Sequence, residues 1–124
     1  YNSVNLFKAS SPLEGALYPS AALVEGREVL LENYVSEWGM AESDLAEYDD
    51  RFFAENDLII ALVEEPSGSI TLDISGVTDT GDGTAVIEIS ENIPEIRTDD
   101  MAWWYVLIEV GKGSVGDNIT LYFN

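Results

Sequence analysis

Leu58-Ile59-Ile60-Ala61-Leu62-Val63 is an unbroken run of six aliphatic residues near the middle of a 124-residue chain. Its length suits a β-strand, and the turn residues Pro66 to Ser69 follow it closely. A strand with no polar residues between its apolar ones is typical of a sheet centre whose two faces are both covered. The run therefore predicts a central strand with packed layers on both sides.

The segments after this run alternate apolar and polar residues, which is the pattern of strands with one buried face. Ile70 to Ile74 and Ala85 to Ile89 flank the turn Asp79-Thr-Gly-Asp-Gly, so they predict a β-hairpin. Trp103 to Val110 and Asn118 to Phe123 predict two further strands. The residues of the last strand that we expect to point inward are Ile119, Leu121 and Phe123.

Helical periodicity marks the segment before the aliphatic run. Apolar residues between Arg27 and Trp38 recur on one helical face, and Gly39 is a natural stop. A second helix is predicted between Ser43 and Asn56, and Phe52 and Phe53 belong to its apolar face. Alternatively, Asp49 caps a shorter helix that spans only Arg51 to Glu55.

Residues 1–25 are less regular, with short strands predicted around Val4 to Leu6 and over Ala21 to Val24. Consecutive strands without intervening helices indicate an antiparallel sheet that curls into a β-sandwich or partial barrel. We therefore expect an α+β fold, with one or two helices from the N-terminal half packed on that sheet. The length suits a single domain over residues 1–124.

The inventory of side chains excludes many functions. The chain has no His and no Cys, so it lacks the Ser-His-Asp and Cys-His nucleophiles and the usual zinc, copper and iron-sulfur ligand sets. We expect no cofactor and no metal. The five basic residues form no patch that could neutralise a phosphate backbone, so we expect no nucleic-acid partner. No apolar stretch is long enough to cross a membrane.

A formal net charge of −19 favours partners of the opposite sign. A protein with a basic face fits this charge, and a solvated surface without any partner is the alternative. The segment Asp79 to Gly83 resembles a calcium loop only poorly, because Gly81 and Ser90 stand where an EF-hand needs oxygen ligands and a carboxylate. We interpret it as a hairpin turn.

Three acidic pairs, Asp49-Asp50, Glu64-Glu65 and Asp99-Asp100, could supply the two carboxyl groups of a small hydrolase. Adjacent residues on a strand point to opposite faces, which argues against joint action of Glu64 and Glu65. Nothing in the sequence places any two carboxyl groups at a catalytic separation. We therefore interpret these pairs as solvated charges.

Trp103-Trp104-Tyr105 is the most conspicuous aromatic cluster. Because alternate strand residues share a face, Trp103 lies with Tyr105 on one face and Trp104 lies on the other. We expect Trp104 to be buried in the β core and Trp103 to be covered by a helix. If Trp103 and Tyr105 are uncovered, they and Tyr122 are candidate binding residues for a peptide or a sugar.

Three stretches carry a family resemblance: Tyr48-Asp-Asp-Arg-Phe-Phe-Ala-Glu-Asn-Asp-Leu-Ile-Ile, Glu64-Glu-Pro-Ser-Gly-Ser-Ile and Thr98-Asp-Asp-Met-Ala-Trp-Trp-Tyr-Val-Leu-Ile-Glu-Val. They resemble small secreted or lipid-anchored proteins of Gram-positive bacteria, and in particular the C-terminal domain of the PrcB family, whose namesake stabilises a partner protease. The resemblance covers about residues 44 to 112. It implies an extracytoplasmic protein, secreted or held at the cell surface by a lipid anchor upstream of Tyr1.

The leading hypothesis is a non-enzymatic extracytoplasmic interaction domain, an accessory or stabilising module for a partner protein such as a protease. The second hypothesis is a carbohydrate- or cell-wall-binding module that uses Trp103, Tyr105 or Tyr122. The third is a small hydrolase that uses two carboxyl groups.

Overall fold

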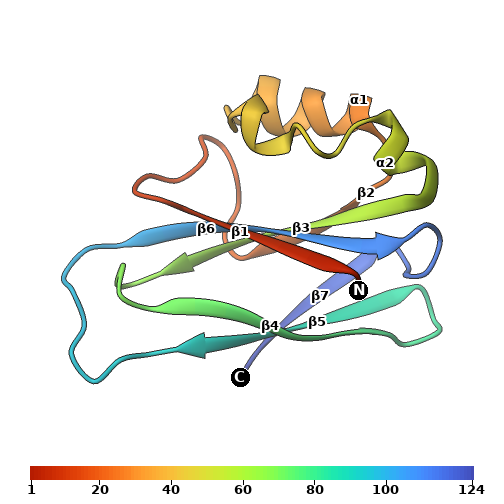
Figure 1. Ribbon diagram of the computed structural model, residues 1–124. Helices are drawn as coiled ribbons and strands as arrows, with labels where there is room; N and C mark the ends of the chain where they lie inside the picture. The colour runs from red at the N-terminus through yellow and green to blue at the C-terminus, as the bar shows by residue number, and fades with distance from the viewer.

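The computed structural model describes all residues from Tyr1 to Asn124. Two β-sheets are stacked, and a helical layer covers the outer face of the larger sheet (Figure 1). This is the expected α+β architecture with a β-sandwich. The elements are β1 (Ser3–Ala9), β2 (Ser20–Val24), α1 (Arg27–Leu30), η1 (Leu31–Glu37), η2 (Glu42–Leu45), α2 (Asp50–Glu55), β3 (Asn56–Glu65), β4 (Thr71–Asp79), β5 (Thr84–Asn92), β6 (Ala102–Gly111) and β7 (Asn118–Phe123).

The predicted central strand is confirmed. β3 lies between β6 and β2 in the sheet of order β1-β6-β3-β2, and all of its pairings are antiparallel. Leu58, Ile60 and Leu62 face the helical layer, whereas the residues between them face the second sheet. β3 is therefore apolar throughout because it contributes to two cores at once.

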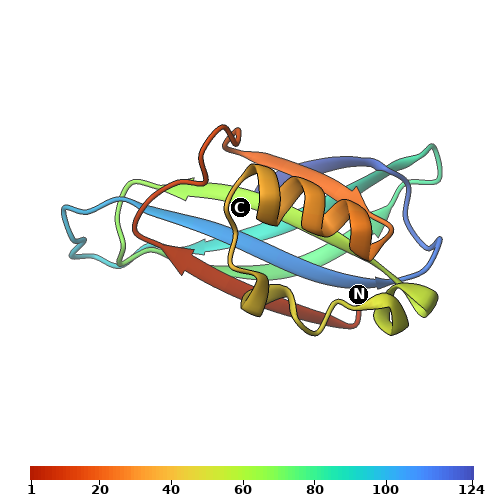
Figure 2. The same cartoon turned by 90° about the horizontal axis from the view of Figure 1, so that it is seen from above.

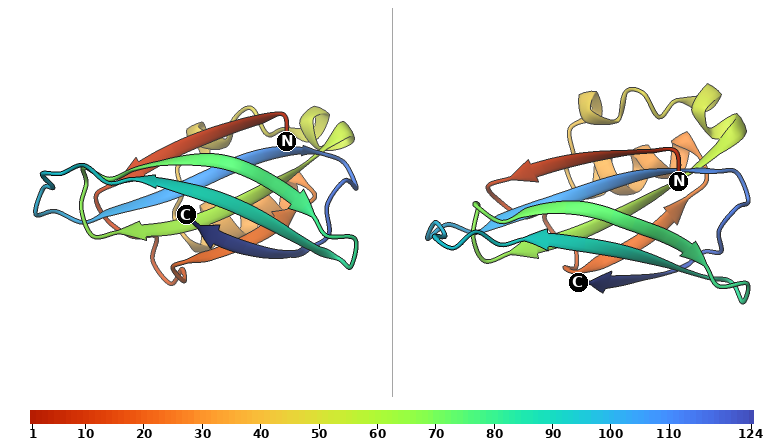
Figure 3. Two further views of the ribbon diagram at one scale, coloured as in Figure 1. Left: turned by 90° about the horizontal axis from the view of Figure 1, so that it is seen from below. Right: turned by 60° about the horizontal axis from the view of Figure 1, so that its bottom comes forward.

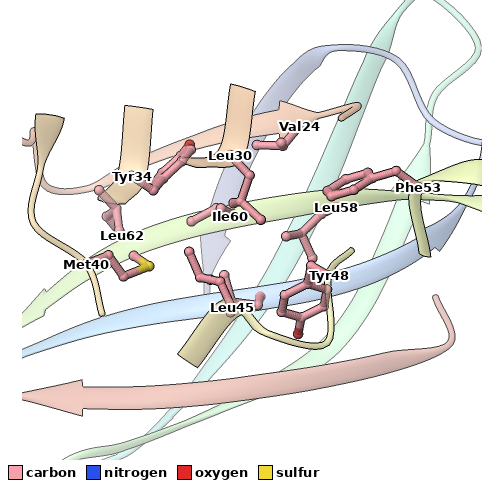
Figure 4. Close-up of a cluster of buried hydrophobic side chains, with 11 residues drawn as sticks. Val24, Leu30, Tyr34, Met40, Leu45, Tyr48, Phe53, Leu58, Ile60 and Leu62 are labelled. Carbon is pink, nitrogen blue, oxygen red and sulfur yellow. The ribbon is translucent and has the colours of Figure 1, made fainter. Parts of the chain in front are cut away.

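The first core lies between the helical layer and the larger sheet (Figure 4). Side chains from the helical layer point down onto β3, and seen from above the α1–η1 segment runs along β2 and β3 (Figure 2). The residues that the helical layer and its connections contribute are Leu30, Tyr34, Met40, Leu45, Tyr48 and Phe53.

The helical layer follows the sequence pattern with one difference. The predicted first helix is present as α1 and the π-helical segment η1, and Gly39, with a φ of 77°, follows its end. The predicted continuous helix from Ser43 to Asn56 is wrong, because the chain forms η2 and then the separate α2. The break lies at Asp49, whose side chain accepts a 2.9 Å hydrogen bond from the Phe52 N–H and so caps α2, as in the shorter alternative.

The second sheet has the order β4-β5-β7 and covers the other face of the larger sheet (Figure 3). The predicted hairpin of β4 and β5 is confirmed, and the three expected residues of β7 pack inward. However, β7 runs parallel to β5, whereas the sequence pattern suggested antiparallel pairing throughout. The chain crosses between the sheets before and after β6, so it reverses twice, and β7 starts beside the start of β5.

The two sheets enclose the second core, to which Trp104, Val106, Ile108 and Val110 of β6 contribute. The expected burial of Trp104 is therefore confirmed. β2 and β7, the edge strands of different sheets, lie next to each other at one side of the sandwich (Figure 3). No helix of this chain combines the length and the apolar composition that a membrane crossing requires.

Candidate functional site

An apolar groove of about 330 Å³ lies between β2 and η1. Ile60 and Leu62 of β3 form its floor, and Tyr34 and Trp38 line its helical side. Its remaining lining residues come from the β1–β2 connection, from β2 and from the end of η1: Gly15, Leu17, Ser20, Ala21, Ala22 and Glu37. The volume lies at the small end of the range of ligand pockets, and it suits one or two apolar side chains.

The groove exists because β2 carries small residues where the helical layer passes over it. Ser20 and Ala22 pair with Leu62 and Ile60, so they share the helix-facing side of the sheet. Neither side chain is large enough to reach the helix. Tyr34 and Trp38 fix the opposite wall by an edge-to-face contact with ring centroids 5.0 Å apart. Burial raises the pKa of Tyr34 to about 12, so its hydroxyl stays neutral.

The groove adjoins a free strand edge. β2 pairs only with β3, and none of the backbone hydrogen bonds outside regular strand pairing involves Ser20 to Val24. Edge strands usually carry charged residues that discourage further pairing, as Lys8 does in β1, but β2 has none. Leu17, just before β2, is 77% exposed. This edge of the larger sheet is therefore unpaired and uncharged, and β7 of the second sheet lies beside it.

A pair of carboxyl groups lies on the opposite, sandwich side of β3. Glu65 follows Val63 on the inward face of β3, and Glu91 follows Ile89 on the inward face of β5. The two side chains therefore meet at one end of the sandwich. They line a pocket of about 260 Å³, whose other lining residues are Tyr18, Pro19, Val63, Glu64 and Phe123.

The environment of Glu65 keeps its carboxyl group neutral. Burial, a hydrogen bond to Glu91 and the charge of Glu91 together raise the pKa of Glu65 from 4.5 to about 8. At neutral pH the Glu65 carboxyl group is therefore protonated. The interpretation of Glu65 as a solvated charge is wrong, because its side chain is only 1% exposed. Glu64 is exposed on the other face, as strand alternation requires.

The sequence held a signal for this pair. Inward positions recur every second residue along a strand, and that rule continued by one step reaches Glu65 from Val63 and Glu91 from Ile89. The interpretation of Glu65 rested on its residue type and not on its position, and Glu91 was not among the candidate residues. The other acidic pairs, Asp49-Asp50 and Asp99-Asp100, are exposed.

The three aromatic candidates do not form one strip. Trp103 is half-buried, and its Nε1–H donates to Glu64 at 2.7 Å. Tyr105 shares its side of β6, stacks on Phe7 with ring centroids 5.1 Å apart and donates its hydroxyl to Asp44 at 2.7 Å. Tyr122 is 56% exposed on β7, whose neighbouring residues Leu121 and Phe123 pack toward the sandwich core. It therefore lies on the outer face of the second sheet, away from the other two.

The turn from Asp79 to Gly83 is held by its own polar groups. Asp82 accepts hydrogen bonds from the Thr80 hydroxyl and the Thr84 N–H, and these bonds, the first above all, lower the pKa of Asp82. The expected hairpin turn is confirmed. No group of three or more acidic side chains comes close enough together to hold a metal ion.

Buried Asp57 is a structural charge. It accepts from Lys112 Nζ at 3.1 Å and from the Gly113 N–H at 2.9 Å, and it thereby ties the start of β3 to the loop after β6.

Comparisons of the chain with models of known protein families, with curated protein sequences and with solved structures found no match.

Proposed function

We propose that this protein is a non-enzymatic interaction domain that binds an extended segment of a partner protein along the free edge of β2. The observation that carries the proposal is the apolar groove of about 330 Å³ beside an unpaired and uncharged edge strand. In this mode of recognition, backbone hydrogen bonds supply affinity and pockets for alternate side chains supply specificity.

The geometry of the edge defines how such a segment would lie. A strand paired with β2 continues the larger sheet, so every second side chain of the partner points to the helical side. There it meets the groove between Ala22 and Trp38. An aliphatic or aromatic residue of the partner would fill this space and cover Leu17.

The charge of the domain indicates what flanks the apolar anchor. The helical layer and its connections, residues 25–55, carry ten acidic and two basic residues. One of the basic residues, Arg27, is engaged with the carbonyl oxygens of Leu45 and Tyr48. Glu37 stands at the groove itself. A partner segment with Lys or Arg near its apolar residue would therefore bind faster and more tightly than a neutral one.

The resemblance to the PrcB family suggests the biological setting. In this proposal the domain acts outside the cytoplasm as an accessory or stabilising module, and the partner is a protein such as a protease. The proposed function does not use the chemistry of a hydrolase. Such an enzyme needs two carboxyl groups at a defined separation across a cleft, and the proposed function gives neither Glu65 nor Glu91 a catalytic role.

Selection from a library of displayed extended peptides tests the proposal. The expected result is enrichment of peptides with an apolar anchor and a nearby basic residue, and their binding should change the fluorescence of Trp38. Ala22→Phe, which fills the groove from the side of β2, should weaken binding by about tenfold or more, corresponding to about 1.4 kcal/mol.

Ala54→Phe is the matched control. Ala54 is exposed on α2 and does not line the groove, so this variant adds the same side chain elsewhere on the surface. It should bind as the unmodified protein does. Equal loss of binding in both variants, or equal retention in both, would show that the groove is not the binding site. Thermal unfolding of both variants establishes that each is folded.

A further inference from the structure

The pocket at the end of the sandwich holds a buried acid without a donor from the rest of the chain. Glu65 is 1% exposed, and its polar partner is another carboxyl group, that of Glu91. The only ion pair of the chain lies elsewhere, between Lys112 and Asp57. Both carboxyl groups line the same pocket of about 260 Å³.

We propose that this pocket binds a primary ammonium group, such as the side-chain terminus of a lysine or the end of an alkylamine. An ammonium group carries three donors on a compact charge, so it can donate to Glu65 and Glu91 together. Tyr18, Val63 and Phe123 line the pocket beside the two acids and supply apolar surface for the attached methylene groups.

The number of oxygens favours an ammonium group over a divalent cation. Calcium takes six to eight oxygen ligands, and no group of three acidic side chains in the chain comes close enough together to hold a metal ion. Two carboxyl groups are enough for an ammonium ion, because they accept two of its three N–H groups and water can accept the third.

Binding of an ammonium group must displace the proton of Glu65. Near neutral pH Glu65 is protonated, since its pKa is raised to about 8. The bound cation stabilises the ionised form of Glu65, so binding removes this proton. The proton leaves to the buffer. Uptake of the cation should release close to one proton at neutral pH and fewer above the raised pKa.

The pocket lies beside the start of β2, and the side chains of Glu65 and Glu91 lie on the opposite side of the larger sheet from the groove. Tyr18 and Pro19 line the pocket, and the next residue, Ser20, lines the groove. In an extended segment, adjacent side chains point to opposite faces. If the proposed function holds, a partner with a lysine next to its apolar anchor could occupy both sites; the ammonium site itself does not depend on that function.

Titration with n-butylammonium chloride tests the site directly. The backbone amide NMR signals of Val63, Glu65, Glu91 and Phe123, and the side-chain carboxyl signals of the two glutamates, should shift and reach saturation. Calorimetry in buffers of different ionisation enthalpy should show proton release. Glu65→Gln keeps the shape of the side chain but cannot complete the charge pair, so it should weaken binding by about tenfold or more. Glu28→Gln, an exposed control on α1 that does not line the pocket, should bind normally.

Tetramethylammonium chloride at the same ionic strength separates a site from general attraction to an acidic protein, because it has charge but no N–H donor. Equal shifts with both salts, shifts that do not saturate, or equal effects of the two variants would each overturn the proposal. Ala22→Phe should leave butylammonium binding unchanged. Failure of the peptide experiment with a positive result here would remove the proposed function and keep the ammonium site.

Discussion

Replacing Glu65 by Gln removes one ionisable group from the carboxyl pair and keeps its shape and a donor to Glu91. In the unmodified protein the pKa of Glu65 rises from 4.5 to about 8 on folding, chiefly because the side chain is buried and secondly because of Glu91. Between these pH values the folded state therefore binds more protons than the unfolded state. The free energy of unfolding must then fall as the pH rises through this window.

The size of the effect follows from the pKa shift. Each pH unit above the unfolded value lowers the free energy of unfolding by about 1.4 kcal/mol until the folded value is reached. At about pH 7 the accumulated penalty is about 3 kcal/mol, which is a large part of the stability of an ordinary domain. We expect Glu65→Gln and the unmodified protein to have similar free energies of unfolding below about pH 4.5. At neutral pH the free energy of unfolding of Glu65→Gln should be higher by about 3 kcal/mol.

Urea unfolding followed by tryptophan fluorescence at a series of pH values measures this difference. Urea is preferable to guanidinium chloride, because a salt would screen the charges under test. Glu64→Gln removes the same charge from the neighbouring exposed residue and should follow the pH dependence of the unmodified protein. Parallel curves for the unmodified protein and Glu65→Gln would refute the reasoning, because they would mean that Glu65 titrates alike in the folded and unfolded states.

Three further substitutions probe the packing. Leu30→Ala should lower the free energy of unfolding by about 3 kcal/mol, because Leu30 lies on the buried face of α1. Val29→Ala, on the exposed face of the same helix, should lower it by less than about 1 kcal/mol. Gly116→Ala should lower the free energy of unfolding by more than about 2 kcal/mol, because a Cβ there would overlap the backbone of the β4–β5 turn. Gly26→Ala has open space around the added Cβ and should lower the free energy of unfolding, and with it the melting temperature, far less. Asp57→Ala should cost about 2 kcal/mol in urea unfolding, because it leaves the backbone N–H of the following loop without its acceptor.

The strands were the most predictable part of the molecule. β3 is buried on both faces and is apolar throughout, whereas in β5 the apolar and polar residues alternate with burial. β6 shows the same alternation over part of its length. The order of residue types therefore predicts which faces are buried. The second helix was less predictable, because a single local hydrogen bond to Asp49 decides where it begins. The parallel pairing of β7 depends on two crossings between sheets, which the pattern within a strand does not encode.

The candidate site was largely beyond sequence reasoning. The groove arises where Ser20 and Ala22 leave space beneath a helix, and small residues in a sequence do not reveal what lies opposite them. Glu65 and Glu91 meet only because two sheets stack in one particular way. Of the aromatic candidates, the alternation on β6 correctly grouped Trp103 with Tyr105, but it could not show that Tyr122 lies on another face.

The order of strands in the larger sheet has a consequence for how the chain is made. β1, which begins at Ser3, pairs with β6, so Ser3 meets Glu109. During synthesis β1 therefore stays unpaired until β6 has been made, and until then β3 lacks one of its two neighbouring strands. Long-range pairing of this kind slows folding and leaves hydrophobic strand edges open to wrong partners. We expect this domain to need protection from a chaperone until β6 has been synthesised.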